Sequence, residues 1–389
     1  MKQIPYGRQY IDGADIKSVQ IALKKEKITT GESVLKLEKN ISRYVGSKYA
    51  SSCSSGTAAL HLAFECFNLE SRDNIIMPAI NFIASYNICR LYKSKIFLAD
   101  VDPFTGQMTP GSLEKCIKIN KLKKIKLVIN MYLGGYPENV NNFFKLKKKY
   151  NFFLLEDACH ALGAKYMHNN KYIRIGSCQH SDICVFSLHP LKIITAGEGG
   201  LVLTNSRKFK KKIDLLRSHG IEKKKNHWNY DVKFCGFNYR LSDIAASLAL
   251  SQLKKINFFI KKRFTISESY KKKLSKFRSY IKLPKYNINT KPAFHLFVLN
   301  IEFKKLNSNK NKFMLHMLKN KIVCQYHYTP IYMFNKIFKK KNLDLNHFPG
   351  AEDYYKNSLS IPIYVDLTES KIRYICKTFF QFIEKNKKL

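Results

Sequence analysis

A single lysine in this chain lies where a buried strand ends and a glycine-rich turn begins. The apolar run Ile183 to Phe186 leads into Ser187–Lys192, and glycines follow at positions 197, 199 and 200. Because a lysine in such a bend is screened from water, desolvation disfavours its charged form and lowers its pKa. The neutral amine can then attack a carbonyl carbon. The spacing therefore predicts Lys192 as the amine of a Schiff base.

A second strand end lies 35 residues before this lysine, where the apolar run Phe152 to Leu155 continues into Glu156–His160. A lysine that takes an aldehyde and a carboxylate that takes a ring nitrogen are the two protein groups that pyridoxal phosphate needs. By itself, Asp157 would more often cap the next helix, and His160 would more often be a core or surface residue. Beside Lys192, we expect Asp157 to pair with the protonated ring nitrogen and His160 to face a cofactor oxygen.

Small polar residues precede a helical run at Ser55, Gly56 and Thr57. Backbone N–H groups at the start of a helix attract anions, although a plain helix cap without a ligand is the alternative. Ser187 adds a hydroxyl at the tip of its strand, so these residues are candidates for a phosphate site. Phe82 follows another strand end and is a candidate for stacking on the cofactor ring, with ordinary core packing as its alternative.

These residues must be positioned by alternating strands and helices. The strand candidates are short, apolar and mostly not alternating, which is typical of a sheet covered on both faces. Helical patterns between them indicate crossover connections and an α/β architecture. We predict strands near Tyr49 and at Asn74–Met77, Lys95–Leu98, Leu127–Asn130, Phe152–Leu155, Ile183–Phe186 and Gly200–Thr204.

The chain length favours one large domain and a smaller one. We expect residues 1–254 to form an N-terminal arm and a large cofactor-binding domain, with helices at Asp15–Leu23, Ser33–Val45 and Leu241–Lys254. Residues 255–389, which include the strand-like run Leu296–Ile301, should form a smaller C-terminal α+β domain.

The formal net charge of +41 raises the hypothesis of a nucleic-acid partner. The charge is carried by short lysine clusters scattered along the chain, whereas nucleic-acid modules more often gather it on one face and include arginines. We therefore expect a lysine-rich solvated surface and no nucleic acid, with long-range attraction of anionic substrates. The clusters are Lys147–Lys149, Lys210–Lys212, Lys223–Lys225, Lys271–Lys273 and Lys339–Lys341.

The cysteines and the apolar runs indicate the compartment. No apolar run approaches the length of a membrane span, and the first residues lack the apolar core of a signal peptide. None of the ten cysteines forms a Cys-x-x-Cys pair, so free buried thiols are favoured over disulfides or a zinc site. We expect a soluble cytoplasmic protein without a membrane partner and without a bound metal.

The ordered set of motifs resembles the DegT/DnrJ/EryC1/StrS family of nucleotide-sugar aminotransferases, over nearly the whole chain. The resemblance implies the aspartate aminotransferase-like fold (fold type I), with a mixed, mostly parallel sheet, pyridoxal phosphate as cofactor, and a homodimer with shared active sites. It implies that Lys192 forms the Schiff base, that Gly56, Thr57 and Ser187 hold the phosphate, and that Asn238 reaches the cofactor phosphate of the partner subunit. The motifs are Ser55–Leu60, Glu156–Gly163, Ser187–Lys192, Gly197–Gly200, Arg217–Gly220 and Gly236–Arg240.

Within the family, the chain is most similar to the transaminases of pseudaminic acid synthesis. This implies L-glutamate as amino donor, amination at C4 of a UDP-4-keto-6-deoxy-N-acetylhexosamine, and UDP-4-amino-4,6-dideoxy-N-acetyl-β-L-altrosamine as product. Ile80-Asn81 departs from the aromatic residue and threonine common in the family. The implied substrate contacts are Tyr6, Lys27, Ile28, Thr29, His189, Arg217, Gln325, His327 and Tyr328.

Three alternatives stay open. The same chemistry could act on another UDP- or dTDP-keto sugar, either D-configured at a 4-keto carbon or carrying a 3-keto group. Related sugar dehydratases replace the lysine with histidine, and Lys192 argues against that reaction. A non-catalytic sensor or nucleic-acid binder on the same fold is the third alternative.

Overall fold

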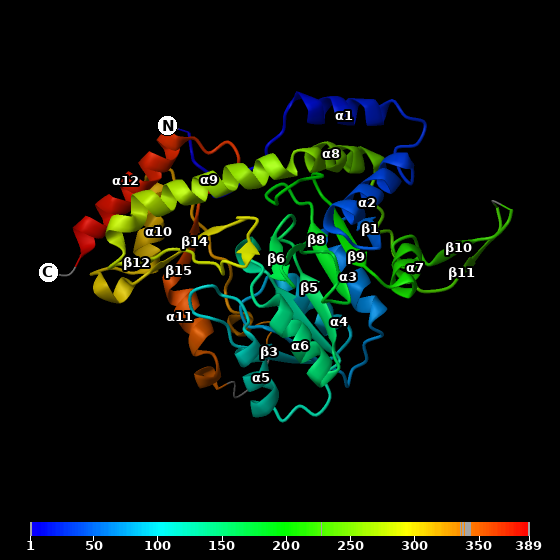
Figure 1. Cartoon of the computed structure of the whole chain (residues 1–389), viewed down its shortest axis with the longest axis horizontal. Helices are drawn as coiled ribbons and strands as arrows, with labels where there is room; N and C mark the ends of the chain where they lie inside the picture. Colours follow the sequence, from blue (N-terminus) through cyan, green and yellow to red (C-terminus); the bar gives the residue numbers. More distant parts are fainter. Residues whose placement is uncertain (1, 227, 335, 337, 339–343, 388–389) are drawn as a thin grey trace.

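A seven-stranded sheet forms the centre of the computed structural model, which describes residues 2–226, 228–334, 336, 338 and 344–387 (Figure 1). Its strand order is β1-β9-β8-β5-β4-β2-β3. The strands are β1 (Tyr49–Cys53), β2 (Asn74–Pro78), β3 (Lys95–Ala99), β4 (Leu127–Met131), β5 (Phe153–Asp157), β8 (Ile183–Ser187) and β9 (Gly200–Thr204). All seven correspond to strands predicted from the sequence.

The sheet is mixed and mostly parallel, as expected. Strands β3, β2, β4, β5 and β8 pair in parallel, β9 runs antiparallel to β8, and β1 runs antiparallel to β9. The carboxyl ends of the parallel strands therefore meet at one edge, which is where open α/β sheets bind ligands.

Helices cover both faces of the sheet, which explains why its strands do not alternate between apolar and polar residues. Along β4, Leu127 and Ile129 pack in one core cluster with α3 and α4, whereas Val128 packs on the opposite side with α5 and α6. The helices of this part are α1 (Gly13–Leu23), α2 (Glu32–Val45), α3 (Gly56–Cys66), α4 (Ile83–Leu91), α5 (Pro110–Ile119), α6 (Val140–Tyr150), α7 (Arg207–Leu216) and α8 (Asp243–Lys254).

The C-terminal part has its own core. It contains a small antiparallel sheet of order β12-β14-β15, whose strands and the helices around it bury a separate apolar cluster. Helices α8 and α9 follow one another along one side of the molecule (Figure 1). The elements are α9 (Ile256–Leu274), β12 (Ile281–Lys282), β14 (Phe297–Ile301), α10 (Lys310–Lys319), α11 (Pro349–Asn357), β15 (Ser358–Ile361) and α12 (Glu369–Asn386).

The expected domain boundary after residue 254 falls between α8 and α9, but the first residues of the chain do not follow it. Ile4 is buried in the C-terminal core cluster and forms a parallel bridge with Ile322. The beginning of the arm therefore packs with the smaller domain, while α1 packs against α8 of the larger one.

Two small antiparallel sheets complete the fold. β6 (Lys165–His168) and β7 (Lys171–Arg174) form a three-stranded sheet with β13 (Thr290–Lys291). The hairpin of β10 (Ile221–Lys223) and β11 (Tyr230–Val232) projects from the body of the molecule (Figure 1). No helix in the described part of the chain is both long and apolar enough to cross a bilayer.

All ten cysteines are described, and each is a free thiol, eight of them buried. No cluster of three metal-ligating side chains occurs among the described residues. The predicted lysine cluster Lys339–Lys341 lies outside those residues.

Candidate active site

Lys192 lies in the turn that follows β8. After Ser187 the chain folds back on itself, with Ala196 N–H donating to Leu188 O (2.9 Å) and Leu188 N–H donating to Gly199 O (2.8 Å). Burial lowers the pKa of the Lys192 amine, and the charges of Cys159 and Asp157 oppose this shift. The lysine is thus desolvated at the bend, as the sequence predicted.

Asp157 occupies the carboxyl end of β5, next to β8 in the sheet. Its side chain is 3% exposed and accepts hydrogen bonds from Cys159 N–H (3.3 Å) and the Ser85 hydroxyl (3.4 Å). Burial raises the pKa of this carboxyl group, and none of the ion pairs formed among the described residues involves it. A cation brought beside a buried acid favours its charged form. Asp157 is therefore suited to a protonated ring nitrogen.

The start of α3 forms a tight cradle beside β8. A Cβ on Gly56 would lie 2.9 Å from Ser187 Cβ, so only glycine lets these two segments approach so closely. The Ser55 hydroxyl oxygen accepts a hydrogen bond from Ala58 N–H (3.0 Å), which is the helix cap considered above. Thr57, Gly56 and Ser187 line the same cavity, and the N-terminal N–H groups of α3 give it the polarity that a phosphate needs.

His160 is held in a defined protonation state by its neighbours. Gly134 N–H donates to His160 Nδ1 (3.2 Å), which places the proton of the neutral ring on Nε2. That nitrogen lies 3.0 Å from the Tyr328 hydroxyl, whose oxygen accepts the bond. Burial keeps the pKa of His160 well below its usual value, so the ring is neutral. The Tyr328 hydroxyl proton is then free to point into the cavity.

A second group of aromatic and histidine side chains closes the cavity from the C-terminal part of the chain. The rings of His295 and His160 lie 4.2 Å apart, and Tyr6 of the arm lies 5.5 Å from His327. Burial lowers the pKa of His327 to about 3, and its Nδ1 lies 2.8 Å from the Ser360 hydroxyl.

Asn81 is a buried amide without partners. It is 1% exposed, lines the cavity, and neither its oxygen nor its nitrogen forms a hydrogen bond with the described residues. An unsatisfied buried amide is costly, so this side chain is suited to polar atoms of a bound ligand. The neighbouring Phe82 is 50% exposed on the same cavity, with its ring 5.6 Å from that of Tyr328. Its exposure argues against simple core packing.

These side chains surround one cavity of about 740 Å³, within the range of small-molecule sites. It brings together residues from both sides of position 254, including Tyr6 of the arm. The predicted site residues that line it are Tyr6, Ser55, Gly56, Thr57, Phe82, Asp157, His160, Ser187, His189, Lys192, Gln325, His327 and Tyr328.

Four predicted residues lie outside this cavity on accessible surface. Lys27, Ile28 and Thr29 are exposed in the turn before α2, and Asn238 is exposed in the loop before α8. The Asn238 side chain forms no hydrogen bond with other described residues.

Arg217 is the fifth predicted residue outside the cavity, and two carboxylates hold its side chain. Its guanidinium is paired with Glu38 and Asp214 and donates to Ser52 O (2.7 Å), away from the cavity. Glu38 is 7% exposed and also accepts hydrogen bonds from the Ser52 amide and hydroxyl. Arg217 therefore neutralises a buried acid, and it does not line the cavity of its own chain.

The sequence interpretation missed several residues of the cavity. Asn81 was noted only as a departure from the family pattern, and His295 was not singled out at all. His295 lies 135 residues from His160, and no local pattern marks it. Other lining residues that were not predicted are Leu60, Glu198, Tyr326, Thr329 and Phe334.

The residues of the cavity fit pyridoxal phosphate. Lys192 offers a desolvated amine, Asp157 a buried carboxyl group without an ion pair among the described residues, and the start of α3 an anion cradle. Asn81 supplies unsatisfied polar atoms and Phe82 an exposed ring. This set matches the aldehyde, ring nitrogen, phosphate and aromatic face of the cofactor.

Comparisons with known proteins agree with an aminotransferase that uses this cofactor. A transaminase of Campylobacter jejuni subsp. jejuni serotype O:23/36 (strain 81-176), named UDP-4-amino-4,6-dideoxy-N-acetyl-beta-L-altrosamine transaminase, is 35% identical over 387 residues, which are 99% of each chain. The structure of Helicobacter pylori PseC, an aminotransferase involved in the biosynthesis of pseudoaminic acid, matches with a TM-score of 0.90 and 29% identity, and covers 99% of this chain and 100% of that one.

A third relative was solved with the cofactor. Spr1654 from Streptococcus pneumoniae, in its PLP form, matches with a TM-score of 0.88 and 25% identity over 98% of this chain and 99% of that one. These structures confirm the predicted fold class. The model of the DegT/DnrJ/EryC1/StrS aminotransferase family matches residues 9–380. The chain therefore belongs to this family and is an aminotransferase that depends on pyridoxal phosphate.

Proposed function

We propose that the protein transfers the amino group of L-glutamate to C4 of a UDP-4-keto-6-deoxy-N-acetylhexosamine, giving UDP-4-amino-4,6-dideoxy-N-acetyl-β-L-altrosamine for pseudaminic acid synthesis. The observation that carries the proposal is the single cavity in which Lys192 and Asp157 face the wall of Tyr6, His327 and Tyr328. The 35% identity to the Campylobacter jejuni transaminase supports this substrate.

The residues of the cavity divide the chemistry between them. Pyridoxal phosphate, when bound, supplies an aldehyde for the amine and a ring that accepts electrons. Asp157 holds a proton on the ring nitrogen, and its burial strengthens that charge-assisted bond. Lys192, once displaced by the amino donor, removes the proton from the α-carbon of glutamate and returns a proton to C4 of the sugar in the second half of the reaction.

The opposite wall positions the sugar. The Tyr328 hydroxyl, oriented by His160, is free to donate to an oxygen of the substrate. Gln325 and His189 line the same space and offer further polar atoms. Because burial lowers the pKa of both His189 and His327, these rings are neutral at pH 7 and contact the substrate without adding positive charge.

We further propose a homodimer in which each site needs both chains. The exposed Lys27, Ile28 and Thr29, together with Asn238, would reach the sugar nucleotide and the cofactor phosphate of the partner subunit. Exposed apolar side chains in this segment support such a contact. Ile28 itself is 47% exposed, and nearby Leu35 is 64% exposed. The free thiols favour a reducing compartment, so we place the protein in the cytoplasm.

The test follows the absorption spectrum of the purified protein loaded with pyridoxal phosphate. Glutamate is added first, and then UDP-4-keto-6-deoxy-L-arabino-N-acetylhexosamine. We expect glutamate to bleach the long-wavelength band of the lysine-bound cofactor and the sugar to restore it. If glutamate bleaches the band but this sugar does not restore it, the substrate proposal is wrong. A D-configured 4-keto sugar or a 3-keto sugar that restores the band would identify the alternative.

A further inference from the structure

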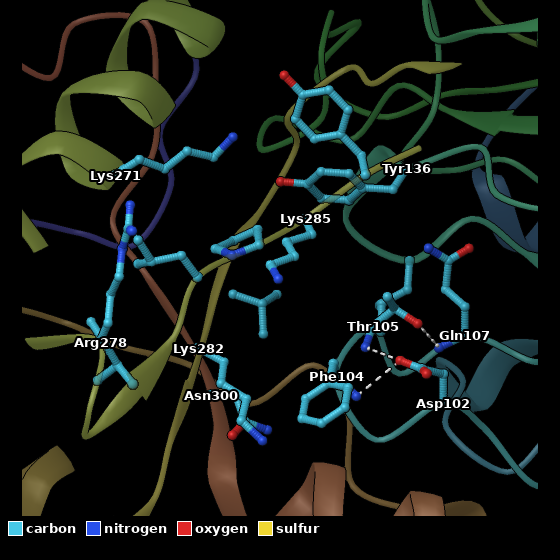
Figure 2. Close-up of a pocket in the computed structure, with 16 residues that line it drawn as sticks. Asp102, Phe104, Thr105, Gln107, Tyr136, Lys271, Arg278, Lys282, Lys285 and Asn300 are labelled. Atoms are coloured by element: carbon cyan, nitrogen blue, oxygen red, sulfur yellow. Dashed lines mark hydrogen bonds between the residues drawn. The ribbon is translucent and has the colours of Figure 1, made fainter. Parts of the chain in front are cut away.

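A second cavity, of about 1000 Å³, lies outside the active site (Figure 2). One side is formed by the loop Asp102–Gln107 of the larger domain and the other by residues 271–300 of the smaller one. Figure 2 shows Lys271 and Arg278 on one side of this space and Asp102, Thr105 and Gln107 across from them. Nothing in the proposed reaction uses this space.

The charge of the cavity is positive and only partly compensated. It is lined by Lys271, Arg278, Lys282 and Lys285. Lys271 pairs with Glu268 (2.9 Å), and Lys282 lies 3.6 Å from Glu302. The side chains of Arg278 and Lys285 form no ion pair or hydrogen bond with any other described residue. A concave surface that carries one sign of charge concentrates oppositely charged ligands.

The acid that lines this cavity does not neutralise it. Asp102 Oδ1 accepts hydrogen bonds from Phe104 N–H (3.0 Å) and Thr105 N–H (2.8 Å), and so holds its own loop in a turn (Figure 2). Next to it, Gln107 is 4% exposed and its Nε2 has no acceptor among the described residues. The cavity therefore combines cations with a buried donor that is left unsatisfied, both of which favour an anionic ligand.

Aromatic rings supply the remaining walls. Tyr136 and Tyr286 lie 6.2 Å apart at an interplanar angle of 35°, and Phe104 is 49% exposed beneath the Lys282 amine. Exposed rings beside cations are typical of surfaces that stack a base while they bind its phosphates. The volume matches the upper end of the range for small-molecule sites, which suits a nucleotide better than a free inorganic ion.

The two cavities share one strip of backbone. Leu133 and Tyr136 line the cationic cavity, while Gly134 between them donates its N–H to catalytic-site His160 (3.2 Å). The Gly134 carbonyl accepts the N–H groups of His295 (2.9 Å) and Leu296 (3.2 Å). A ligand that moves Tyr136 would therefore move the group that orients His160 and, through it, Tyr328.

We propose that this cationic cavity is a second binding site, for a nucleoside phosphate, and that its occupation alters the active site through Leu133–Tyr136. The site goes beyond the proposed transamination and does not depend on which sugar is aminated. Its phosphates would contact Arg278 and Lys285, and its base would stack between the aromatic walls.

The test measures the stoichiometry of UDP binding to the holoenzyme by calorimetry. We expect two UDP molecules per chain, one in the active site and one here. The double variant Arg278→Glu/Lys285→Glu should lose the second molecule, with its affinity reduced at least about tenfold. Both side chains are exposed, so folding should be unaffected. The matched control is Lys261→Glu/Lys319→Glu, which makes the same charge change at exposed positions outside the cavity and should still bind two.

The outcomes separate this site from the proposed function. If UDP does not enter the active site, the wild type should bind one UDP molecule per chain and Arg278→Glu/Lys285→Glu should bind none. That result would still support the second site. A double variant that binds UDP as the wild type does would overturn the site, and so would an equal loss in the control. Binding of inorganic pyrophosphate as tight as that of UDP would contradict the nucleoside part.

The coupling has its own readout. UDP should change the rate of the half-reaction with glutamate at least twofold in the wild type and leave it unchanged in Arg278→Glu/Lys285→Glu. A wild-type rate that does not respond to UDP at saturation of both sites would overturn the coupling.

Discussion

The two sides of the active-site cavity are built in different ways. The cofactor side, with Lys192, Asp157 and Gly56, comes from neighbouring elements of one sheet, at the ends of β8 and β5 and the start of α3. The substrate side, with Tyr6, His295 and Tyr328, comes from three segments far apart in the chain. The residues that fit the cofactor are thus placed by one sheet, whereas the residues that we propose for substrate specificity depend on tertiary packing between distant segments.

The largest effect is expected on the cofactor side. Lys192→Ala removes both the amine that bonds the cofactor and the group that moves the proton, so turnover should fall roughly 10⁴-fold or more. Steady-state kinetics with glutamate and the keto sugar would measure this. Lys171→Ala, at an exposed lysine in β7, is the matched control and should retain full activity. Substantial turnover by Lys192→Ala would remove this residue from its role.

Asp157→Asn should lower turnover by about 10²–10³-fold, because the neutral amide no longer stabilises the charged ring. The variant should also change a pH profile. The Asp157 charge raises the pKa of Lys192 against the effect of burial, so its removal should lower that pKa. Since only the neutral amine bonds the aldehyde, cofactor capture should persist to lower pH in the variant. Titration of the absorption band would measure the shift, with the exposed Asp353→Asn as control. A profile shifted to higher pH would contradict this arrangement.

On the substrate side we expect a smaller and more selective effect. Tyr328→Phe leaves His160 Nε2–H without its acceptor and removes a donor to the sugar, which should lower kcat/KM for the keto sugar about tenfold. The half-reaction with glutamate should change less. The control is Tyr326→Phe, whose hydroxyl lies 3.0 Å from Asn311 Oδ1 instead. If both half-reactions slow equally, the two sides of the cavity are not separable as described.

The smallest effect on activity is expected for Arg217, which resemblance assigned to the substrate and the structure assigns to Glu38. Arg217→Gln leaves a buried carboxylate without its main partner and should lower the free energy of unfolding by about 3 kcal/mol, with KM for the sugar unchanged. Denaturant titration and steady-state kinetics would separate the two readouts. Arg207→Gln, at an exposed position of the same helix, is the control. An increased KM for the sugar with an unchanged free energy of unfolding would show that Arg217 contacts the substrate instead.

The same division explains what the sequence could predict. Lys192 and Asp157 each follow an apolar run of strand length, so burial, the turn and the chemistry could be inferred within a dozen residues. The seven strands were recognised for the same reason. Which strands become neighbours depends on long-range packing, and the order β1-β9-β8-β5-β4-β2-β3 was not inferred.

The substrate side resisted prediction because its contacts are tertiary. His295 is marked by no local pattern, and it reaches His160 only because Gly134 pairs with His295 N–H. Arg217 shows the reverse case: its motif is local, but its partner Glu38 lies on α2, and no local pattern marks the burial of that acid.

The position of the arm sets an order on the making of this protein. Ile4 donates its N–H to Lys321 O (2.8 Å) and accepts from Val323 N–H (2.9 Å), and Tyr6 O accepts from Ile363 N–H (3.0 Å). Ile4 and Tyr6 must therefore wait for partners at residues 321–363, which are synthesised much later. At usual rates of synthesis that wait lasts roughly 20–70 s, during which the apolar arm has no native partner. This wall of the cavity therefore forms only after residue 363 has been synthesised, and a change in the arm would be felt at the active site.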